Sequence, residues 1–325
     1  MDAARYSSIA QQITDEIGTV IVGQTSLVRD ALLCLLAEGH LLIEGVPGLG
    51  KTQLVTALAA VVGADWRRIQ FTPDLMPADI VGTQVLVTDD SGGRSFRFQA
   101  GPVFTNLVLA DEINRATPKT QSALLEAMQE RHVTSSGETR PLPRPFLVLA
   151  TQNPIEQEGT YPLPEAQLDR FLLKSVVERP SVDELTVIID RTTSSTVVVP
   201  SQVTNAAELR ELVAFTRAVP VPSHVVRYVA ELVEATHPHD AAPDIVRRYA
   251  RFGASPRGAQ ALILGAKATA LLDGRPSVAA ADVAAVAPSA LQHRIGLSFE
   301  AAVDGVVARD VVGAVLDHVS AAPSV

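Results

Sequence analysis

Cysteine, aromatic residues and positive charge are scarce in this chain of 325 residues. The single cysteine, Cys34, excludes an intramolecular disulfide and a zinc site built from cysteines. It lies in the apolar run Ala31–Leu36, which favours a core residue over a reactive thiol. Aromatic residues make up only 4% of the chain, so we expect Val, Leu, Ala and Ile to fill the core.

Negative charge exceeds positive charge. The 27 Lys and Arg residues against 36 Asp and Glu residues give a net charge of −9, and only four of the basic residues are lysines. The field of the whole chain therefore does not attract nucleic acid or an anionic membrane, although it leaves room for a local basic channel inside an assembly. We do not expect nucleic acid as a partner.

Long apolar runs are also missing. No run reaches the about 18 residues that a membrane-spanning helix needs, and the first nine residues carry neither the apolar segment nor the cleavage site of a secretory signal. We expect a cytoplasmic protein without a membrane span. Its 47% hydrophobic and 19% charged residues are ordinary for a folded protein, and its length predicts about two domains.

Between residues 39 and 177, short apolar runs alternate with helical patterns. This alternation is typical of a parallel β-sheet covered by helices. The predicted strands are Leu41–Glu44, Arg68–Phe71, Leu107–Ala110, Phe146–Thr151 and Leu172–Val177. The predicted helices are Leu27–Ala37, Thr52–Val62 and Pro118–Glu130.

Two segments do not fit this simple alternation. Thr72–Gln99 contains two alternating stretches around a glycine pair and predicts a hairpin-like insertion, and Arg131–Arg144 has a second strand-turn-strand pattern. After about Thr192, prolines separate helical blocks such as Ser223–Thr236, and Ser255–Gly274 has the cap and stop signals of another helix. We expect an α/β domain over residues 1–194 and an all-helical domain over residues 195–325.

One glycine-rich segment matches the pattern G-x-x-x-x-G-K-[ST] in full. It follows the predicted strand Leu41–Glu44 and opens a predicted helix, which is the context this phosphate-binding loop needs. Glycines let backbone N–H groups turn toward phosphate oxygens, the lysine reaches the β- and γ-phosphates, and the threonine hydroxyl ligates Mg²⁺. The predicted nucleotide-binding residues are Gly45, Val46, Pro47, Gly48, Leu49, Gly50, Lys51 and Thr52.

Two further predicted strands end in polar side chains. The run Leu107–Ala110 leads into Asp111, which is expected to hold the Mg²⁺ shell, and Glu112, which is expected to orient or deprotonate the attacking water. The strand at Phe146–Thr151 leads to Asn153. In a parallel sheet this end would lie beside Asp111, so Asn153 is expected to contact the γ-phosphate or the water, although a plain Asn-Pro turn is the alternative.

Five segments carry these and related patterns. They are Gly45–Thr52, Leu109–Arg115, Ala150–Pro154, Leu163–Phe171 and Ser255–Arg257. Together they resemble the MoxR family of AAA+ ATPases, over residues 18 to 290. The resemblance implies a P-loop NTPase core with a parallel five-stranded sheet, a hairpin insertion after the second strand and an all-α C-terminal lid. It also implies ATP and Mg²⁺ as cofactors and a homo-oligomeric ring, usually a hexamer.

The resemblance assigns roles to further residues. It implies that Asn153 is the sensor-1 residue, that Arg170 is the arginine finger and that Arg257 is the sensor-2 residue of the lid. A guanidinium stays protonated and binds phosphate oxygens bidentately, which suits both arginines for these roles. A surface ion pair of Arg170 with its neighbour Asp169 is the alternative. Rival arginines also exist: Arg115 and Arg131 for the finger, and Arg251 for the lid.

A short segment near the start resembles the part of such proteins that contacts the adenine base. It consists of Ile21, Val22 and Gly23, and a simple apolar approach to a helix is nearly as good an interpretation.

The leading functional hypothesis is an ATP-hydrolysing chaperone or remodeller that assembles, activates or loads cofactor into a client protein complex. The resemblance implies a partner with a von Willebrand factor A domain. One alternative is a nucleotide-dependent switch or scaffold. Another is a nucleic-acid-dependent motor, which the negative charge and the few aromatic residues disfavour.

Overall fold

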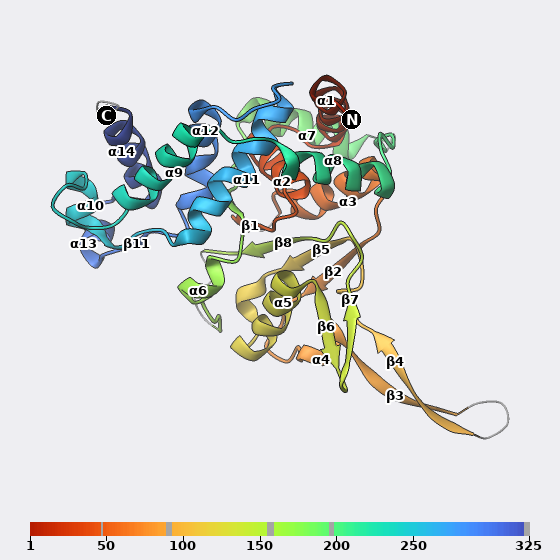
Figure 1. The fold of residues 1–325 in the computed structure, drawn as a ribbon. Helices are drawn as coiled ribbons and strands as arrows, with labels where there is room; N and C mark the ends of the chain where they lie inside the picture. Colours follow the sequence, from red (N-terminus) through yellow and green to blue (C-terminus); the bar gives the residue numbers. More distant parts are fainter. Residues whose placement is uncertain (47, 89–92, 155–158, 195–197, 322–325) are drawn as a thin grey trace.

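The computed structural model describes residues 1–46, 48–88, 93–154, 159–194 and 198–321. Its centre is a five-stranded sheet in the order β2-β5-β8-β1-β9, in which every neighbouring pair is parallel (Figure 1). This confirms the predicted parallel sheet, with strand ends that differ by at most two residues. The strands are β1 (Leu41–Glu44), β2 (Trp66–Gln70), β5 (Leu107–Asp111), β8 (Leu147–Gln152) and β9 (Leu173–Val176).

The sheet separates two hydrophobic cores. Successive side chains of a strand point to opposite faces; thus Leu107 and Leu109 of β5 belong to one core, and Val108 and Ala110 belong to the other. Their burial on both faces explains why the central strands are apolar runs without polar alternation. The first face carries α1 (Ala3–Val20), α2 (Thr25–Leu36) and α3 (Lys51–Val62), and the second carries α4 (Pro77–Val81) and α5 (Pro118–Glu130).

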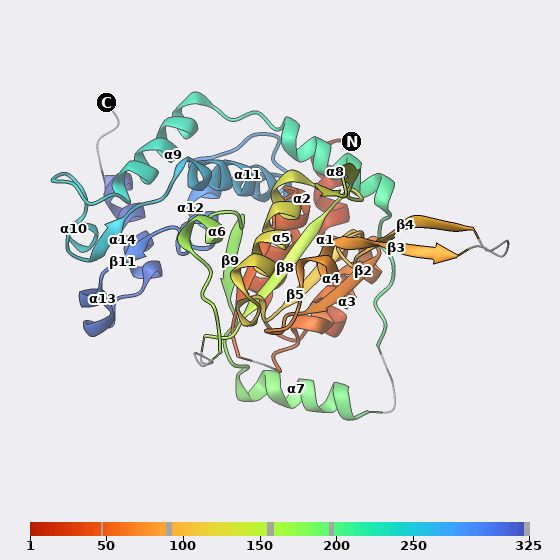
Figure 2. The ribbon, with the colours of Figure 1, turned by 90° about the horizontal axis from the view of Figure 1, so that it is seen from below.

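Both predicted hairpins are present. The first, β3 (Gly82–Thr88) with β4 (Arg94–Ala100), extends away from the body of the molecule (Figures 1 and 2). At its base Gly82 has a φ of +92°, and a Cβ there would lie 2.4 Å from the carbonyl oxygen of Gln99, so the close approach of the strands requires glycine. The second hairpin is β6 (His132–Ser135) with β7 (Glu138–Pro141).

The C-terminal part is helical, as expected, with one correction. A short antiparallel pair, β10 (Ala250–Phe252) and β11 (Gly296–Leu297), is inserted among the helices. Strands of two or three residues are too short to show an alternating pattern, so the sequence did not reveal them. Helix α7 (Val182–Thr193) precedes this part, whose helices are α8 (Ala206–Ala218), α9 (Ser223–Ala235), α10 (Asp244–Tyr249), α11 (Pro256–Leu272), α12 (Ala280–Leu291), α13 (Phe299–Val303) and α14 (Ala308–Ala321).

Helix α11 shows how local signals set these bounds. Its N-cap is Ser255, whose hydroxyl accepts a hydrogen bond from the backbone N–H of Arg257 at 3.0 Å, and Pro256 is its first residue. Gly274, with a φ of +70°, closes the other end. The start and the stop that the sequence predicts are therefore confirmed.

The helical part packs on one face of the sheet. Helix α11 contacts α1 and α2 as well as α8, α9 and α12, and one continuous hydrophobic core runs from the sheet into these helices. In Figure 2, helices α9, α10, α12, α13 and α14 lie to the left of the sheet, and the β3–β4 hairpin extends to the right. Among the described residues, no helix combines the length and the apolar character that crossing a membrane requires.

Candidate active site

The glycine-rich loop connects β1 to α3. Gly45 is buried, and a Cβ there would lie 2.9 Å from Cβ of Val177, so only glycine fits between the two strands. Gly48 and Gly50 have φ values of +84° and +76°, the left-handed region that turns backbone N–H groups to one side. Pro47, which the sequence assigns to this loop, lies outside the described residues.

Lys51 and Thr52 stand at the first turn of α3. The Lys51 ammonium donates a hydrogen bond to the carbonyl oxygen of Gly45 at 2.5 Å, which folds the side chain back over the loop. Burial lowers the pKa of Lys51, and the nearby carboxylates of Asp111 and Glu112 oppose this shift. Thr52 is exposed. The loop, the lysine and the two carboxylates therefore share one environment, as the sequence predicts.

Both carboxylate oxygens of Asp111 are engaged. Oδ1 accepts a hydrogen bond from the Thr151 hydroxyl at 2.7 Å. Oδ2 forms an ion pair with Arg68, with Nη2 at 2.5 Å and Nε at 3.1 Å. The strand order explains these contacts, because β5 lies between β2, which carries Arg68, and β8, which ends near Thr151.

Glu112 follows Asp111 with a φ of +57°, which turns its side chain out of the strand direction. Its Oε2 accepts hydrogen bonds from Gln70 Nε2 and Arg115 Nη1, each at 3.0 Å, and its backbone N–H donates to the Thr151 hydroxyl at 2.8 Å. Arg115 therefore binds the carboxylate of its own chain. Arg68, Gln70 and Thr151 are site residues that the sequence analysis did not assign.

Asn153 is buried just beyond β8. The preceding residue, Gln152, accepts a hydrogen bond from the backbone N–H of Gly45 at 3.2 Å, so the end of β8 lies directly beside the phosphate loop. The structure thus brings together the three strand ends that the sequence analysis selected, with Lys51, Asp111 and Asn153 at one edge of the sheet.

The segment Ile21–Gly23 connects α1 to α2. The next residue, Gln24, donates from Nε2 to the carbonyl oxygen of Leu49 at 3.3 Å, which fastens the segment to the phosphate loop. Gly23, with a φ of +66°, lies against the side chain of Glu184 on α7. The segment therefore stands where a base attached to a bound phosphate chain could reach it, and its contact with adenine stays a prediction.

The donors available for Mg²⁺ are the Thr52 hydroxyl and the Asp111 carboxylate. Within the described part of the chain, no group of three or more His, Cys, Asp or Glu side chains could hold a metal ion by itself. A small number of protein donors is typical of Mg²⁺, which is usually bound through one or two protein ligands, water and the phosphates of its nucleotide. The donor set fits Mg²⁺ bound together with a nucleotide.

Arg170 and Arg257 lie elsewhere. They line a cavity of about 270 Å³ between the amino ends of β1 and β9 and the helix α11. Arg170 precedes β9, whereas Lys51 and Asp111 follow the carboxyl ends of β1 and β5. A strand of four residues is about 13 Å long, so both arginines stand at the far end of the sheet from the phosphate loop of their own chain.

This cavity is strongly basic. Arg131 pairs with Glu38 at 2.6 Å and Arg294 pairs with Asp169 at 2.8 Å, whereas within the described residues the Arg257 guanidinium makes one long hydrogen bond, to Gln129 Oε1 at 3.4 Å. The described charged side chains that line it are Arg131, Arg170, Arg217, Arg257, Arg294, Glu38 and Asp169. An excess of guanidinium groups in a concave site favours an anion.

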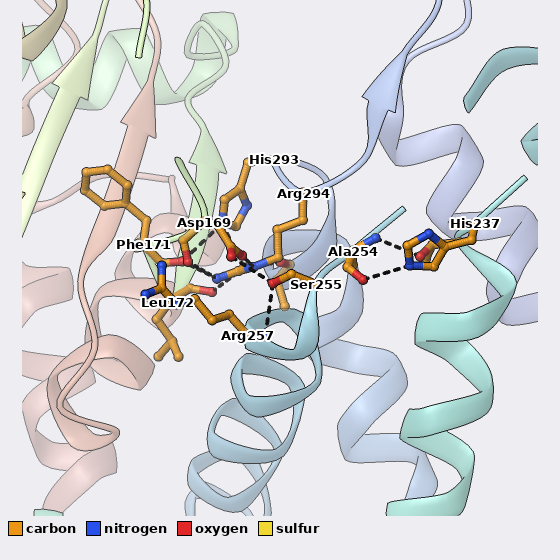
Figure 3. Close-up of polar contacts among 11 residues, drawn as sticks. Asp169, Phe171, Leu172, His237, Ala254, Ser255, Arg257, His293 and Arg294 are labelled. Carbon is orange, nitrogen blue, oxygen red and sulfur yellow. Dashed lines mark hydrogen bonds and ion pairs between the residues drawn. The ribbon is translucent and has the colours of Figure 1, made fainter. Parts of the chain in front are cut away.

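Asp169 ties the helical part to the sheet (Figure 3). Its carboxylate accepts hydrogen bonds from the Ser255 hydroxyl at 2.8 Å and from Arg294 Nε at 2.8 Å. The alternative interpretation of the sequence is an ion pair between Asp169 and Arg170. Among the described residues, Asp169 pairs with Arg294 instead. Nε of Arg170 is buried and lacks a hydrogen-bond partner among the described residues. Arg251 lies on β10 and is not among the described residues that line the cavity.

Comparison with known proteins gives consistent matches. The model of the ATPase family associated with various cellular activities (AAA) matches residues 40–173, and the AAA lid domain matches residues 243–315. The chain is 40% identical to a candidate ATPase of known structure from Cytophaga hutchinsonii, with a TM-score of 0.90 and coverage of 97% of this chain and 96% of the other.

Similar sequences of whole proteins agree. The chain is 46% identical to Chaperone MoxR1 of Mycobacterium tuberculosis over 306 residues, which cover 94% of this chain and 80% of that protein. It is 33% identical to Protein MoxR of Paracoccus denitrificans over 296 residues, with 86% of each chain covered. With the phosphate loop, the acidic strand end and the lid in place, the chain belongs to the MoxR family of AAA+ ATPases.

Proposed function

We propose that the protein hydrolyses ATP to ADP and phosphate with Mg²⁺, as a homo-oligomeric ring, expected to be a hexamer, in the cytoplasm. The observation that carries this proposal is the separation of two half-sites. The phosphate loop, Asp111 and Glu112 lie at the carboxyl edge of the sheet, and the arginine cavity lies at its amino edge. A ring of copies placed head to tail brings one half-site against the other.

Each residue of the first half-site has a defined task in this proposal. The backbone of Gly45–Thr52 and the Lys51 ammonium hold the phosphates, and Thr52 and Asp111 hold Mg²⁺, which stabilises phosphate charge when it is bound. Glu112 orients the attacking water and accepts its proton, and Asn153 donates to the γ-phosphate or to that water. Before they can perform these tasks, the carboxylate of Asp111 has to release Arg68, and the carboxylate of Glu112 has to release Gln70 and Arg115.

Arg170 and Arg257 supply the missing positive charge from the neighbouring subunit. Charge on the γ-phosphate oxygens develops during phosphoryl transfer, and an arginine finger typically increases the rate by about 10³–10⁵. Arg170 suits this task because its buried Nε has no partner among the described residues.

Mixing two inactive variants tests this arrangement. Arg170→Ala should bind ATP and assemble but hydrolyse slowly, and Lys51→Ala should lose nucleotide binding. In an equimolar mixture, about a quarter of the interfaces combine an intact loop with an intact finger, so turnover should recover to about that fraction. Arg115→Ala in place of Arg170→Ala is the control. Failure to recover with Arg170→Ala would favour Arg115 or Arg131 as the finger.

We further propose that the ring remodels a protein client, assembling it, activating it or loading its cofactor, together with a partner that carries a von Willebrand factor A domain. The name of the relative Chaperone MoxR1 supports a chaperone role. A Glu112→Gln variant, which should hold ATP without cleaving it, is the form with which to capture the client and identify it by mass spectrometry. If no other protein is recovered together with the Glu112→Gln ring, the chaperone role is rejected.

A nucleotide-dependent switch is the second candidate. The engagement of Asp111 by Arg68 and of Glu112 by Gln70 and Arg115 favours it, because these contacts would make basal turnover slow. If the Glu112→Gln variant supports the protein's cellular role to the same extent as the unaltered chain, the switch is the correct function and not the chaperone.

A further inference from the structure

Helix α7 carries an exposed apolar stripe. Val182, Leu185 and Ile189 are spaced three and four residues apart, so they lie on one face of the helix, and their exposed fractions are 81%, 45% and 52%. No residue of α7 is buried, and Figure 2 shows the helix as an outlying rod at one edge of the molecule. An amphipathic helix that presents its apolar face to water indicates a missing partner.

Helix α7 belongs to the nucleotide side of the molecule. The side chain of Glu184 lies against Gly23, and Arg191 Nη1 donates to the carbonyl oxygen of Thr19 at 2.7 Å. The segment that contains Gly23 is itself bound to the phosphate loop through Gln24. The α7 stripe therefore lies next to the half-site with the phosphate loop, which the neighbouring subunit completes in the proposed ring.

A second exposed apolar patch lies on the helical part. Phe299 and Val303 are spaced four residues apart on α13 and have exposed fractions of 85% and 68%, and Val307, between α13 and α14, is 55% exposed. This α13 patch is attached to β10 and β11, since Ser298 donates its backbone N–H to the carbonyl oxygen of Tyr249 at 2.8 Å. A phenylalanine that is 85% exposed, with an exposed valine on the same short helix, is unusual on the surface of an isolated subunit.

The α13 patch belongs to the arginine side. Phe252 of β10 and Gly253 line a small cavity together with Asp169 and Arg294, and these two charged residues also line the arginine cavity. When the arginine face of one subunit meets the nucleotide face of the next, the α13 patch and the α7 stripe are brought to the same boundary. They are two different surfaces of one chain, as a head-to-tail contact requires.

Exposed charges of opposite sign lie near the two surfaces. Asp183 and Asp190 are exposed beside the α7 stripe. Near the α13 patch, Arg248 of α10 is bound to Glu300 and Asp304, but Arg251 is exposed and makes no side-chain hydrogen bond or ion pair within the described residues. Such complementarity fixes the orientation of a contact more than its strength.

We propose that the α7 stripe of one subunit packs against the α13 patch of the next, so that the ring is closed by this apolar contact as well as by the nucleotide. The proposal rests on the ring of the proposed function. It names the second copy of this chain as the occupant of both surfaces.

Assembly of charged variants tests the proposal. In the Glu112→Gln background with ATP and Mg²⁺, Leu185→Asp and Phe299→Asp should each weaken assembly by about tenfold or more, measured by sedimentation velocity across a concentration series. Val226→Asp on α9, which is 50% exposed, is the matched control and should assemble normally. Binding of a fluorescent ATP analogue to the diluted variants should stay unchanged, which shows that they are folded.

Disulfide trapping tests the contact directly. In a Cys34→Ala background, Leu185→Cys combined with Phe299→Cys should yield a ladder of covalent multimers on oxidation, and Leu185→Cys combined with Val226→Cys should not. A ring that assembles equally well in all charged variants and gives no ladder overturns this contact while leaving the ring intact. A chain that stays monomeric with ATP overturns both, and loss of client capture from an intact ring would assign the α7 stripe to the client instead.

Discussion

At the scale of single residues, Asp111 and Arg68 define the resting state of the site. The Arg68 guanidinium binds Oδ2 of Asp111, and the Thr151 hydroxyl donates to Oδ1, so neither carboxylate oxygen is without a partner. If Asp111 holds Mg²⁺ as proposed, Arg68 and Mg²⁺ compete for its carboxylate. The Arg68 side chain is 48% exposed, and ion pairs so exposed contribute about 1 kcal/mol at most, so the competition is mild.

Removing this competitor should make the site take up Mg²⁺ more readily. We expect Arg68→Ala to lower the Mg²⁺ concentration for half-maximal ATP binding by up to about fivefold, measured with a fluorescent ATP analogue in Mg²⁺ titrations. Arg67→Ala is the matched control, because Arg67 neighbours Arg68 on β2 and, among the described residues, its side chain bonds only to the carbonyl oxygen of Trp66. An equal effect of both variants would mean that general charge, and not the Asp111 contact, is responsible.

At the scale of elements, His40 joins three pieces of the core at the amino edge of the sheet. The buried imidazole accepts the backbone N–H of Val148 at Nδ1 and donates from Nε2 to the carbonyl oxygen of Met128, both at 3.0 Å. It thereby fixes the end of α5 against β8 and the start of β1. Burial lowers the pKa of His40 to about 4.

Stability should consequently depend on pH through His40. The folded pKa lies below the unfolded value of about 6.5, so the stabilisation is complete above that value and is lost as the pH falls toward 4. Between pH 7 and pH 5 this loss is about 2 kcal/mol in the free energy of unfolding. His40→Gln keeps a donor and an acceptor and should remove this part of the pH dependence in urea titrations. The exposed His224→Gln should leave it unchanged.

Particular residues show how far the sequence reaches. The phosphate loop, Asp111 and Asn153 could be placed because each follows an apolar strand, and strands of a parallel sheet end at one edge. The sequence could not pair Arg68 with Asp111 or Gln70 with Glu112, because those contacts depend on β2 lying next to β5. It could not place Arg257 beside Arg170 either, because that depends on how the helical part packs on the sheet.

At the scale of the whole molecule, the proposed pairing of the two half-sites would make ATP hydrolysis a property of the assembly. We expect ATP turnover per subunit to rise with protein concentration and to reach a plateau when the rings are complete, because Arg170 and Arg257 stand at the far end of the sheet from the phosphate loop of their own chain. Steady-state assays over a hundredfold range of concentration, with light scattering on the same samples, check this. A monomer that turns over ATP at the plateau rate would contradict it.

The clamp on Asp169 links the two arginines mechanically. Ser255, directly before α11, and Arg294, after α12, both grip the residue that precedes Arg170, and Arg257 stands on the first turn of that same α11. Arg170 and Arg257 are thus held by the same set of contacts. A movement of one of them toward a nucleotide would therefore also move the other. In the proposed ring, a tilt of the lid in one subunit would therefore change the charge at the nucleotide of its neighbour.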